Sequence, residues 1–498
     1  MLTPLFMKNF KIPVFIAAFL SASVCTALWR GNVTGPFSSS ADAPAQSTEA
    51  AYVPLPKGSV TFNKHIAPIV FSNCSPCHRS GEVAPFALLN YEDTRKRAKQ
   101  IALVTRSRYM PPWKADEGRE KFHDARRLSN QEIGLIEQWA RDGAPQGDAK
   151  DLPATPKFAT GWALGEPDAV FQPDTEYSLA AEGDDVYRCF VLPTNYAEDR
   201  YLSAFEIRSG NRKIVHHVIA YLDTQGRARK LDEADAGPGY TSFGGIGFNP
   251  SGALGGWAPG ISPQRLPQGV GILLPKGADI ILQVHYHKSG KPEIDRTKLG
   301  AYFSKEPVDK QLRVAPIANL GIRIPAGNKN YQARASMTAP ADISVLQVTP
   351  HMHLLGHDMT VTATLPDKTQ QKLVRVPEWD FNWQTTYTLR QPIQLPAGSR
   401  VDVEAHYDNS EDNIVNPNTP PKEVTWGEQT TDEMLIAFIH YTVDAEHLTR
   451  GRTAQGADNQ SRMEQLRQMF DKNGDGVLDD AERAAAAQWL NERRNRRD

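Results

Sequence analysis

The segment NCSPCHRSG holds Cys74, Cys77 and His78 in a Cys-x-x-Cys-His spacing, which is typical of covalent haem attachment. The two cysteines would bind the haem through thioether bonds, and the histidine would be one axial ligand of the iron. Further on, RYMPPWK places Met110 in a loop stiffened by two prolines, which suits the second axial ligand of an electron-carrying haem. His123 is a weaker candidate for that position. The sequence predicts one haem c. The alternatives for the Cys-x-x-Cys-His motif are a chance match and a dithiol redox motif, and the alternative for Met110 is an ordinary core methionine.

Seven of the 13 histidines gather in four short places of the region beyond residue 150. They are His216, His217, His285, His287, His351, His353 and His357. Side chains alternate between the two faces of a strand, so His351 and His353 can hold one ion together. The adjacent pair His216 and His217 can converge only at a bulge or a strand end. For any single histidine, a satisfied core or surface residue is the simpler interpretation, but the set predicts metal binding.

The types of these side chains limit which metal ion could bind. Imidazole suits copper, zinc, iron and nickel alike, whereas a methionine thioether favours copper, especially Cu(I). Met434, in the segment TTDEMLIAFIHY, is the candidate thioether.

The tail contains DKNGDGVLDDAE, residues 471–482, which matches a calcium-binding EF-hand loop. Gly476 occupies the obligatory sixth position. The ligand positions are filled by Asp471, Asn473, Asp475, the carbonyl of Val477, Asp479 and Glu482. The sequence therefore predicts one calcium site in a C-terminal helix pair, residues 455–498, with a chance acidic loop as the alternative.

The N-terminus predicts export. Lys8 and Lys11 precede an apolar run over residues 12–29, so residues 1–30 are expected to be a signal peptide or an uncleaved membrane anchor. Residues 31–55 have the small, polar composition of a linker. We therefore expect the protein to be periplasmic or otherwise exported. Anchoring to the inner membrane is an open alternative.

The linker is followed by two segments with different sequence patterns, one helical and one β-rich, which together predict a multidomain, mainly β protein. Residues 56–150 are helical, with a capping box of Ser129 and Glu132 ahead of the helix QEIGLIEQWARDG, and this segment resembles a small class I-like cytochrome c domain. Residues 151–450 alternate short β-type runs with Gly and Pro turns, as β-sandwiches do.

Charge and cysteine content exclude other classes. The formal net charge of −2 argues against nucleic-acid binding. Of the four cysteines, one lies in the export segment and two in the haem motif, which leaves Cys189. The chain is therefore not a disulfide scaffold, and Cys189 is expected to be a small buried residue, with a regulatory thiol as the alternative.

The order of these motifs resembles the type II copper, ascorbate-dependent monooxygenases, which include peptidylglycine α-hydroxylating and dopamine β-monooxygenases. The resemblance covers roughly residues 175–445 and rests on VHHVIAYL, on WAPGISPQRLPQGVG before LQVHY, on HMHLLG and on the Thr-Asp-Glu-Met segment. It implies two jelly-roll-like β-sandwiches, residues 151–320 and 321–450, with one copper each.

The resemblance also implies the ligands. His216, His217 and His285 would hold an electron-transfer copper, with His287 able to assist or replace His285. His351, His353 and Met434 would hold the copper that meets O₂ and substrate.

Departures from the family bear on stability and substrate. The animal enzymes carry several disulfides, whereas only Cys189 remains here. Thr349, Ile436 and Phe438 stand where the peptide-amidating enzymes place polar residues that clamp a carboxylate. This difference argues against a peptidyl-glycine substrate and favours a more apolar one.

Together these features predict an exported copper monooxygenase that hydroxylates a C–H bond of a small molecule or peptide with O₂. An external donor would reduce the haem, and the haem would reduce the first copper. The alternatives are a haem and copper electron-transfer or copper-handling protein without hydroxylase activity, and a binding module that has lost copper.

Overall fold

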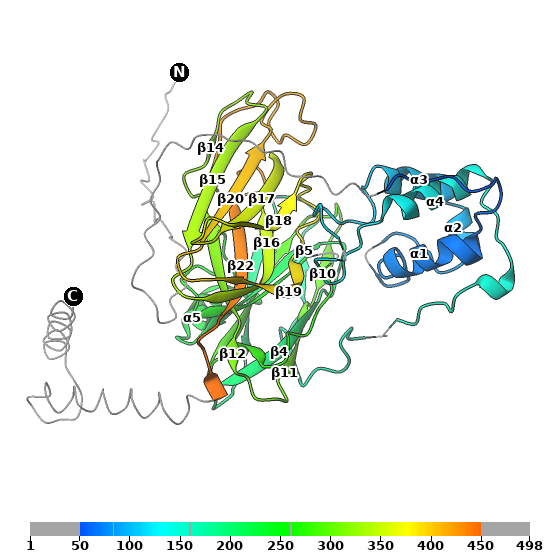
Figure 1. Cartoon of the computed structure of the whole chain (residues 1–498). Helices are drawn as coiled ribbons and strands as arrows, with labels where there is room; N and C mark the ends of the chain where they lie inside the picture. Colours follow the sequence, from blue (N-terminus) through cyan, green and yellow to red (C-terminus); the bar gives the residue numbers. More distant parts are fainter. Residues whose placement is uncertain are drawn as a thin grey trace, which may run out of the picture.

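The computed structural model describes residues 50–449, except 83, 119, 159, 160, 259, 260 and 428. The predicted export segment, most of the predicted linker and the predicted calcium loop with Asp471 and Glu482 lie outside the described residues. Among the described residues, no helix combines the length and the apolar composition needed to span a membrane. The prediction of a mainly β protein is confirmed (Figure 1).

A helical part comes first and lies to one side of the β structure (Figure 1). Its elements are η1 (Phe62–Ile66), α1 (Ala67–Asn73), α2 (Tyr91–Arg95), α3 (Ala98–Arg106), α4 (Asn130–Arg141) and η2 (Ala149–Asp151). The predicted capping box is confirmed: the Ser129 hydroxyl accepts from the backbone N–H of Glu132, whose carboxylate accepts from the N–H of Ser129. Phe62, Ile136 and Trp139 are fully buried in the core between these helices.

The first β unit contains two five-stranded sheets, with orders β1-β11-β4-β8-β12 and β6-β3-β9-β5-β7, and the ribbon β10-β2. The bounds are β1 (Ala169–Phe171), β2 (Tyr177–Leu179), β3 (Val186–Pro193), β4 (Arg200–Arg208), β5 (Val215–Asp223), α5 (Arg227–Ala234), β6 (Tyr240–Thr241), β7 (Gly252–Trp257), β8 (Val270–Leu274), β9 (Asp279–Tyr286), β10 (Glu293–Asp295), β11 (Lys298–Phe303) and β12 (Lys310–Gln311). Every residue of β9 is buried, because both of its faces are covered. Cys189 on β3 is fully buried and unpaired, as expected.

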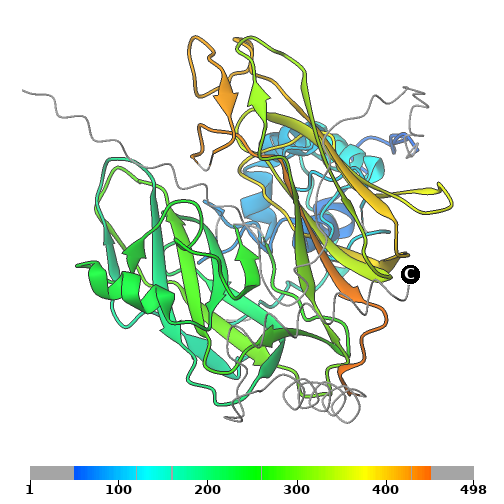
Figure 2. The ribbon, with the colours of Figure 1, turned by 90° about the vertical axis from the view of Figure 1, so that its left-hand side faces the viewer.

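The second β unit contains two four-stranded sheets, with orders β13-β22-β16-β19 and β15-β20-β17-β18, and the ribbon β14-β21. The bounds are β13 (Arg313–Ala318), β14 (Arg323–Ile324), β15 (Tyr331–Thr338), β16 (Ile343–His351), β17 (Gly356–Thr364), β18 (Gln370–Val376), β19 (Tyr387–Leu395), β20 (Arg400–Tyr407), β21 (Val424–Thr425) and β22 (Ile436–Val443). The two β units stand next to one another (Figure 2). Alternate residues along β20 are buried, which places one face of its sheet on the core of a sandwich.

A segment that we call the strap, residues 113–125, joins the helical part to the second β unit. Its side chains Trp113, Ala115, Phe122 and Ala125 belong to the core of that unit. The backbone continues the edge of the sheet, because the N–H of His123 donates to the carbonyl of Thr388 at 2.8 Å.

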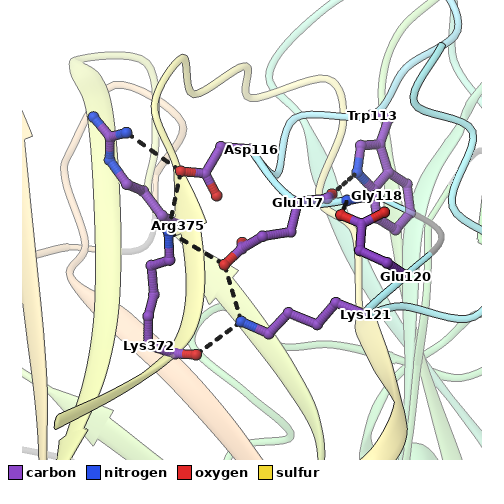
Figure 3. A network of polar contacts seen from close by, with 8 residues as sticks. All are labelled: Trp113, Asp116, Glu117, Gly118, Glu120, Lys121, Lys372 and Arg375. Carbon is purple, nitrogen blue, oxygen red and sulfur yellow. Dashed lines mark hydrogen bonds and ion pairs between the residues drawn. The ribbon is translucent and has the colours of Figure 1, made fainter. Parts of the chain in front are cut away.

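Charged side chains hold the strap against β18 (Figure 3). Lys372 lies 3.4 Å from the carboxylate of Asp116 and 3.2 Å from that of Glu117, while Arg375 also pairs with Asp116 at 3.3 Å. Lys121 binds Glu117 at 3.0 Å and the carbonyl of Lys372 at 2.7 Å. The loop of Met110 is thereby fixed to the second β unit at its C-terminal end.

Candidate metal centres

The haem motif lies in a turn directly after α1. The N–H groups of Cys77 and His78 donate to the carbonyl of Cys74 at 3.1 and 2.9 Å, and both cysteines are free thiols. The Nδ1 of His78 contacts the carbonyl of Phe86 at 3.1 Å, which leaves Nε2 available as an axial ligand. Burial raises the pKa of Cys74 to about 12. Redox-active Cys-x-x-Cys pairs need a lowered thiol pKa, so the raised pKa argues against dithiol chemistry, while haem attachment at this site stays a prediction.

Met110 lies between α3 and the strap. Its N–H donates to the carbonyl of Val104 at 3.0 Å, and its half-buried side chain lines a small pocket with Leu128 and Ile133. Its role as second axial ligand stays a prediction. The rival candidate His123 is exposed on the strap, where its backbone is bound to β19.

Three histidines of the first β unit converge as one potential ligand group. Along β5 and β9, Val215 pairs with Tyr286 and His217 pairs with His285, so His216 is the extra residue of a bulge. This bulge turns two adjacent side chains the same way, as predicted. One ring nitrogen from each of His216, His217 and His285 lies within 4.8 Å of the other two.

The same nitrogen of each ring faces the centre of this group. The Nδ1 atom of His217 lies 3.3 Å from that of His216 and 3.4 Å from that of His285. At the far side, Nε2 of His285 is bound to the carboxylate of Asp185 at 2.9 Å. A carboxylate on the outer nitrogen fixes the ring orientation and strengthens the inner nitrogen as a metal ligand.

His287 lies apart from that group. It is mostly exposed, and its Nδ1 binds the other oxygen of Asp185 at 3.0 Å. His287 therefore lies next to His285 and does not take its place in the ligand group.

The second group lies at the end of β16, where the rings of His351 and His353 have centres 5.2 Å apart and nearly perpendicular planes. The Nδ1 of His351 contacts the side-chain oxygen of Gln384 at 2.8 Å, and the Nδ1 of His353 contacts the carbonyl of Asp432 at 3.1 Å. These bonds occupy both Nδ1 atoms and leave both Nε2 atoms for a metal.

Burial favours the neutral, metal-binding form of imidazoles in both groups. Burial lowers the pKa of His216 to about 4, and burial together with the neighbouring His353 lowers that of His351 to about 3. Burial also lowers the pKa of His353 to about 4, with a smaller contribution from the charges of His285 and His216. The two groups are thus near enough to affect one another electrostatically.

One buried acidic side chain joins the backbone of His353 to the backbone of Met434. Glu433 is fully buried and accepts the N–H groups of His353, Leu355 and Met434 at 2.9, 2.7 and 3.0 Å. Burial raises the pKa of Glu433 to about 8. The side chain of Met434 is 9% exposed, and its carbonyl accepts from the hydroxyl of Tyr407 at 2.8 Å. These contacts fix the backbone of Met434, and a thioether together with two imidazoles would be a donor set that suits copper.

The three residues that were related to the choice of substrate share one half-buried sheet face with His351. Thr349 stands two residues before His351 on β16, while Ile436 and Phe438 on β22 pair with His351 and Thr349. His357 lies outside this face, exposed and bound to Asp358 at 2.9 Å.

Several functional residues have no signal in the motifs. Asp185 and Gln384 meet their histidines only through the folding of loops far apart in sequence. Glu433 could have been singled out, because it directly precedes Met434 in the quoted Thr-Asp-Glu-Met segment.

Comparison with a family model and with curated proteins points to monooxygenases. Residues 321–461 match the family model of the copper type II ascorbate-dependent monooxygenase, C-terminal domain. The human DBH-like monooxygenase protein 1 is 23% identical over 285 residues, which are 52% of this chain and 44% of that protein. The human putative DBH-like monooxygenase protein 2 is 22% identical over 286 residues, 53% of this chain and 54% of that protein.

The matched part of this chain thus spans about half the length of these curated relatives. Both comparisons support a relationship to the copper type II ascorbate-dependent monooxygenases, which are oxidoreductases. Among solved structures, one of infectious bursal disease virus, strain Gx, aligns over 56% of this chain and 72% of that chain with 9% identity and a TM-score of 0.17, which is too low to inform on the fold.

Proposed function

We propose that this protein is a copper-dependent monooxygenase that hydroxylates a C–H bond of its substrate with O₂. The observation that carries the proposal is the pair of ligand groups: three histidines converging at the bulge of β5, and two histidines whose second member shares the Glu433 carboxylate with Met434. Bound copper would supply one-electron redox chemistry and the activation of O₂, neither of which side chains provide.

The residues divide into two sets. His216, His217 and His285 would hold the electron-transfer copper through Nδ1. His351, His353 and Met434 would hold the copper that meets O₂, with the two imidazoles binding through Nε2. Burial keeps these imidazoles neutral, and the Glu433 carboxylate fixes the backbone of His353 relative to Met434.

The substrate would lie on the sheet face of Thr349, Ile436 and Phe438. This face offers apolar side chains and one hydroxyl, and Thr349 itself is bound to Thr386 at 2.9 Å. Because no carboxylate clamp stands at these three positions, an uncharged, more apolar substrate fits better than a peptidyl-glycine.

Electrons would arrive through a haem c held by Cys74, Cys77, His78 and Met110, reduced by an external donor. An ion pair between Glu82, just after the haem motif, and Arg212, four residues before His216, supports this route. Export to the periplasm through residues 1–30, with an inner-membrane anchor as the alternative, and calcium binding at residues 471–482 belong to the same proposal.

The test uses the full chain, matured with haem and reconstituted with copper. Elemental analysis is expected to give one iron and two coppers per chain, and His351→Ala is expected to lose one copper only. Met434→Ala should keep the haem spectrum and abolish O₂-dependent hydroxylation. One iron without copper would refute the proposal, and two coppers without O₂-dependent substrate oxidation would point to an electron-transfer protein.

A further inference from the structure

The loop between β18 and β19, residues 377–386, contacts both members of the second histidine group. We call it the bridging loop. The indole N–H of Trp379 donates to the carbonyl of His353 at 3.1 Å. Gln384 accepts from Nδ1 of His351 at 2.8 Å. The orientation of the His351 imidazole and the position of the His353 backbone therefore both depend on this one loop.

The bridging loop also reaches the first histidine group, which belongs to the other β unit. The ring of Phe381 stacks on that of His216, with centres 5.2 Å apart and planes at 21°. Its edge meets the ring of His353, with centres 5.8 Å apart and planes at 82°. A single phenyl ring thus lies between an imidazole of each group, and each geometry is a favourable one for aromatic pairs.

The haem-bearing part of the chain holds the same loop. Lys114 at the start of the strap lies 3.5 Å from the carboxylate of Asp380, and both side chains are shielded, with 11% and 17% exposed. Next to this pair, the ring of Trp113 meets that of Tyr387 edge-on at 5.1 Å, where the bridging loop ends. Since the network of Figure 3 fixes the strap to β18, the Lys114–Asp380 contact is fixed in place.

We propose that Phe381 is a positioning residue that sets the separation of the two histidine groups. The bridging loop carries it into the space between them, and the Lys114–Asp380 pair ties the loop to the strap and thus to the loop of Met110. The inference rests on the proposed function, because the separation matters for the passage of electrons between two bound coppers.

Electron paramagnetic resonance of the oxidised, dicopper protein tests this without substrate. The dipolar coupling between two Cu(II) ions falls with the cube of the distance between them. The wild type is expected to show dipolar broadening absent from the summed spectra of the single-copper variants His216→Ala and His351→Ala. Phe381→Ala is expected to keep two coppers and the haem spectrum but lose that broadening, because the ring that contacts an imidazole of each group and holds the two groups at one short distance is gone.

Further variants keep the test decisive if Phe381→Ala binds less copper. Phe381→Tyr retains the ring and should keep the wild-type broadening, whereas Phe381→Leu should lose it. Asp380→Asn should weaken it by releasing the loop. Phe303→Ala, which removes a half-buried ring remote from both groups, is the matched control and should change nothing.

The outcomes separate the two proposals. Two coppers with wild-type broadening in Phe381→Ala and Phe381→Leu would overturn the role of Phe381 and leave the proposed function intact. Two coppers without broadening in the wild type would also overturn it. Fewer than two coppers in the wild type would refute the proposed function itself.

Discussion

The imidazoles of both groups are oriented by side chains and carbonyls that would not touch a metal. His285 has Asp185 behind it, His351 has Gln384, and His353 has the carbonyl of Asp432. A ring that has one nitrogen occupied presents only the other, so the ligand atom is fixed before any metal arrives. The protein thereby limits the rearrangement that binding or a change of oxidation state requires.

Asp185 gives the first prediction. Asp185→Asn keeps the shape of the side chain but removes the negative charge that strengthens His285 as a ligand. Copper affinity of the first group should fall about 10- to 100-fold, as for other carboxylates behind a ligating histidine. Competition titration with a copper chelator measures this, and the second group should be unaffected.

The neighbouring residue supplies the control. Asp184 is exposed, so Asp184→Asn makes the same charge change without touching the ligand group. An equal loss of affinity in both variants would mean that overall charge, rather than the bond to His285, is responsible.

At this scale the candidate ligands could be singled out from the sequence, whereas most of the groups that orient them could not. Strand geometry allowed His216 and His217 to converge only at a bulge or a strand end, and the structure has a bulge at this place. Asp185 and Gln384 could not be predicted, because each reaches its histidine from a different loop and hydrogen bonds between loops leave no periodic pattern in the sequence.

Among the elements, the strap is the one that links two parts of the fold. Phe122 is fully buried, lies 5.4 Å from the ring of Tyr387, and pairs with Leu389 on β19. Phe122→Ala should lower the local stability of the strap and β19 by about 3–5 kcal/mol, which is usual for truncating a buried phenylalanine. Hydrogen exchange at the amides of β19 measures this free energy of local opening.

An exposed helical residue serves as the comparison. Leu103 on α3 is 57% exposed, so Leu103→Ala should change stability by less than about 0.5 kcal/mol. Unchanged exchange on β19 in Phe122→Ala would show that the strap merely lies on the sheet without stabilising it.

The strap also marks the limit of prediction for elements. The helix α4 was predictable because its capping box and apolar spacing are local signals. Residues 113–125 have no such spacing and follow two prolines, so they resemble an ordinary loop. Their place in the core of the second β unit depends on contacts with β18 and β19, more than 240 residues away in sequence.

For the molecule as a whole, the place of the haem motif relative to the first histidine group matters most. Glu82 pairs with Arg212 and also with Arg79 at 3.0 Å, and Arg79 stacks over the ring of Phe158 at 4.3 Å. The pair of Glu82 and Arg212 joins the helical part to the turn that leads into β5, and Arg79 supports Glu82 from within that part. These contacts are the means by which a haem held at Cys74 and Cys77 would stay close to His216.

The last prediction concerns this contact. Arg212→Glu places two carboxylates together and should slow the oxidation of ferrous haem by the copper-loaded first group by about fivefold, which corresponds to about 1 kcal/mol for a partly exposed ion pair. Combining it with Glu82→Arg restores opposite charges and should recover most of the rate. Stopped-flow absorbance of the haem measures each variant, and the effect should shrink in high salt because partly exposed charges are screened. Lys213→Glu makes the same charge change one residue away on an exposed side chain, so an equal slowing there would refute a specific docking contact.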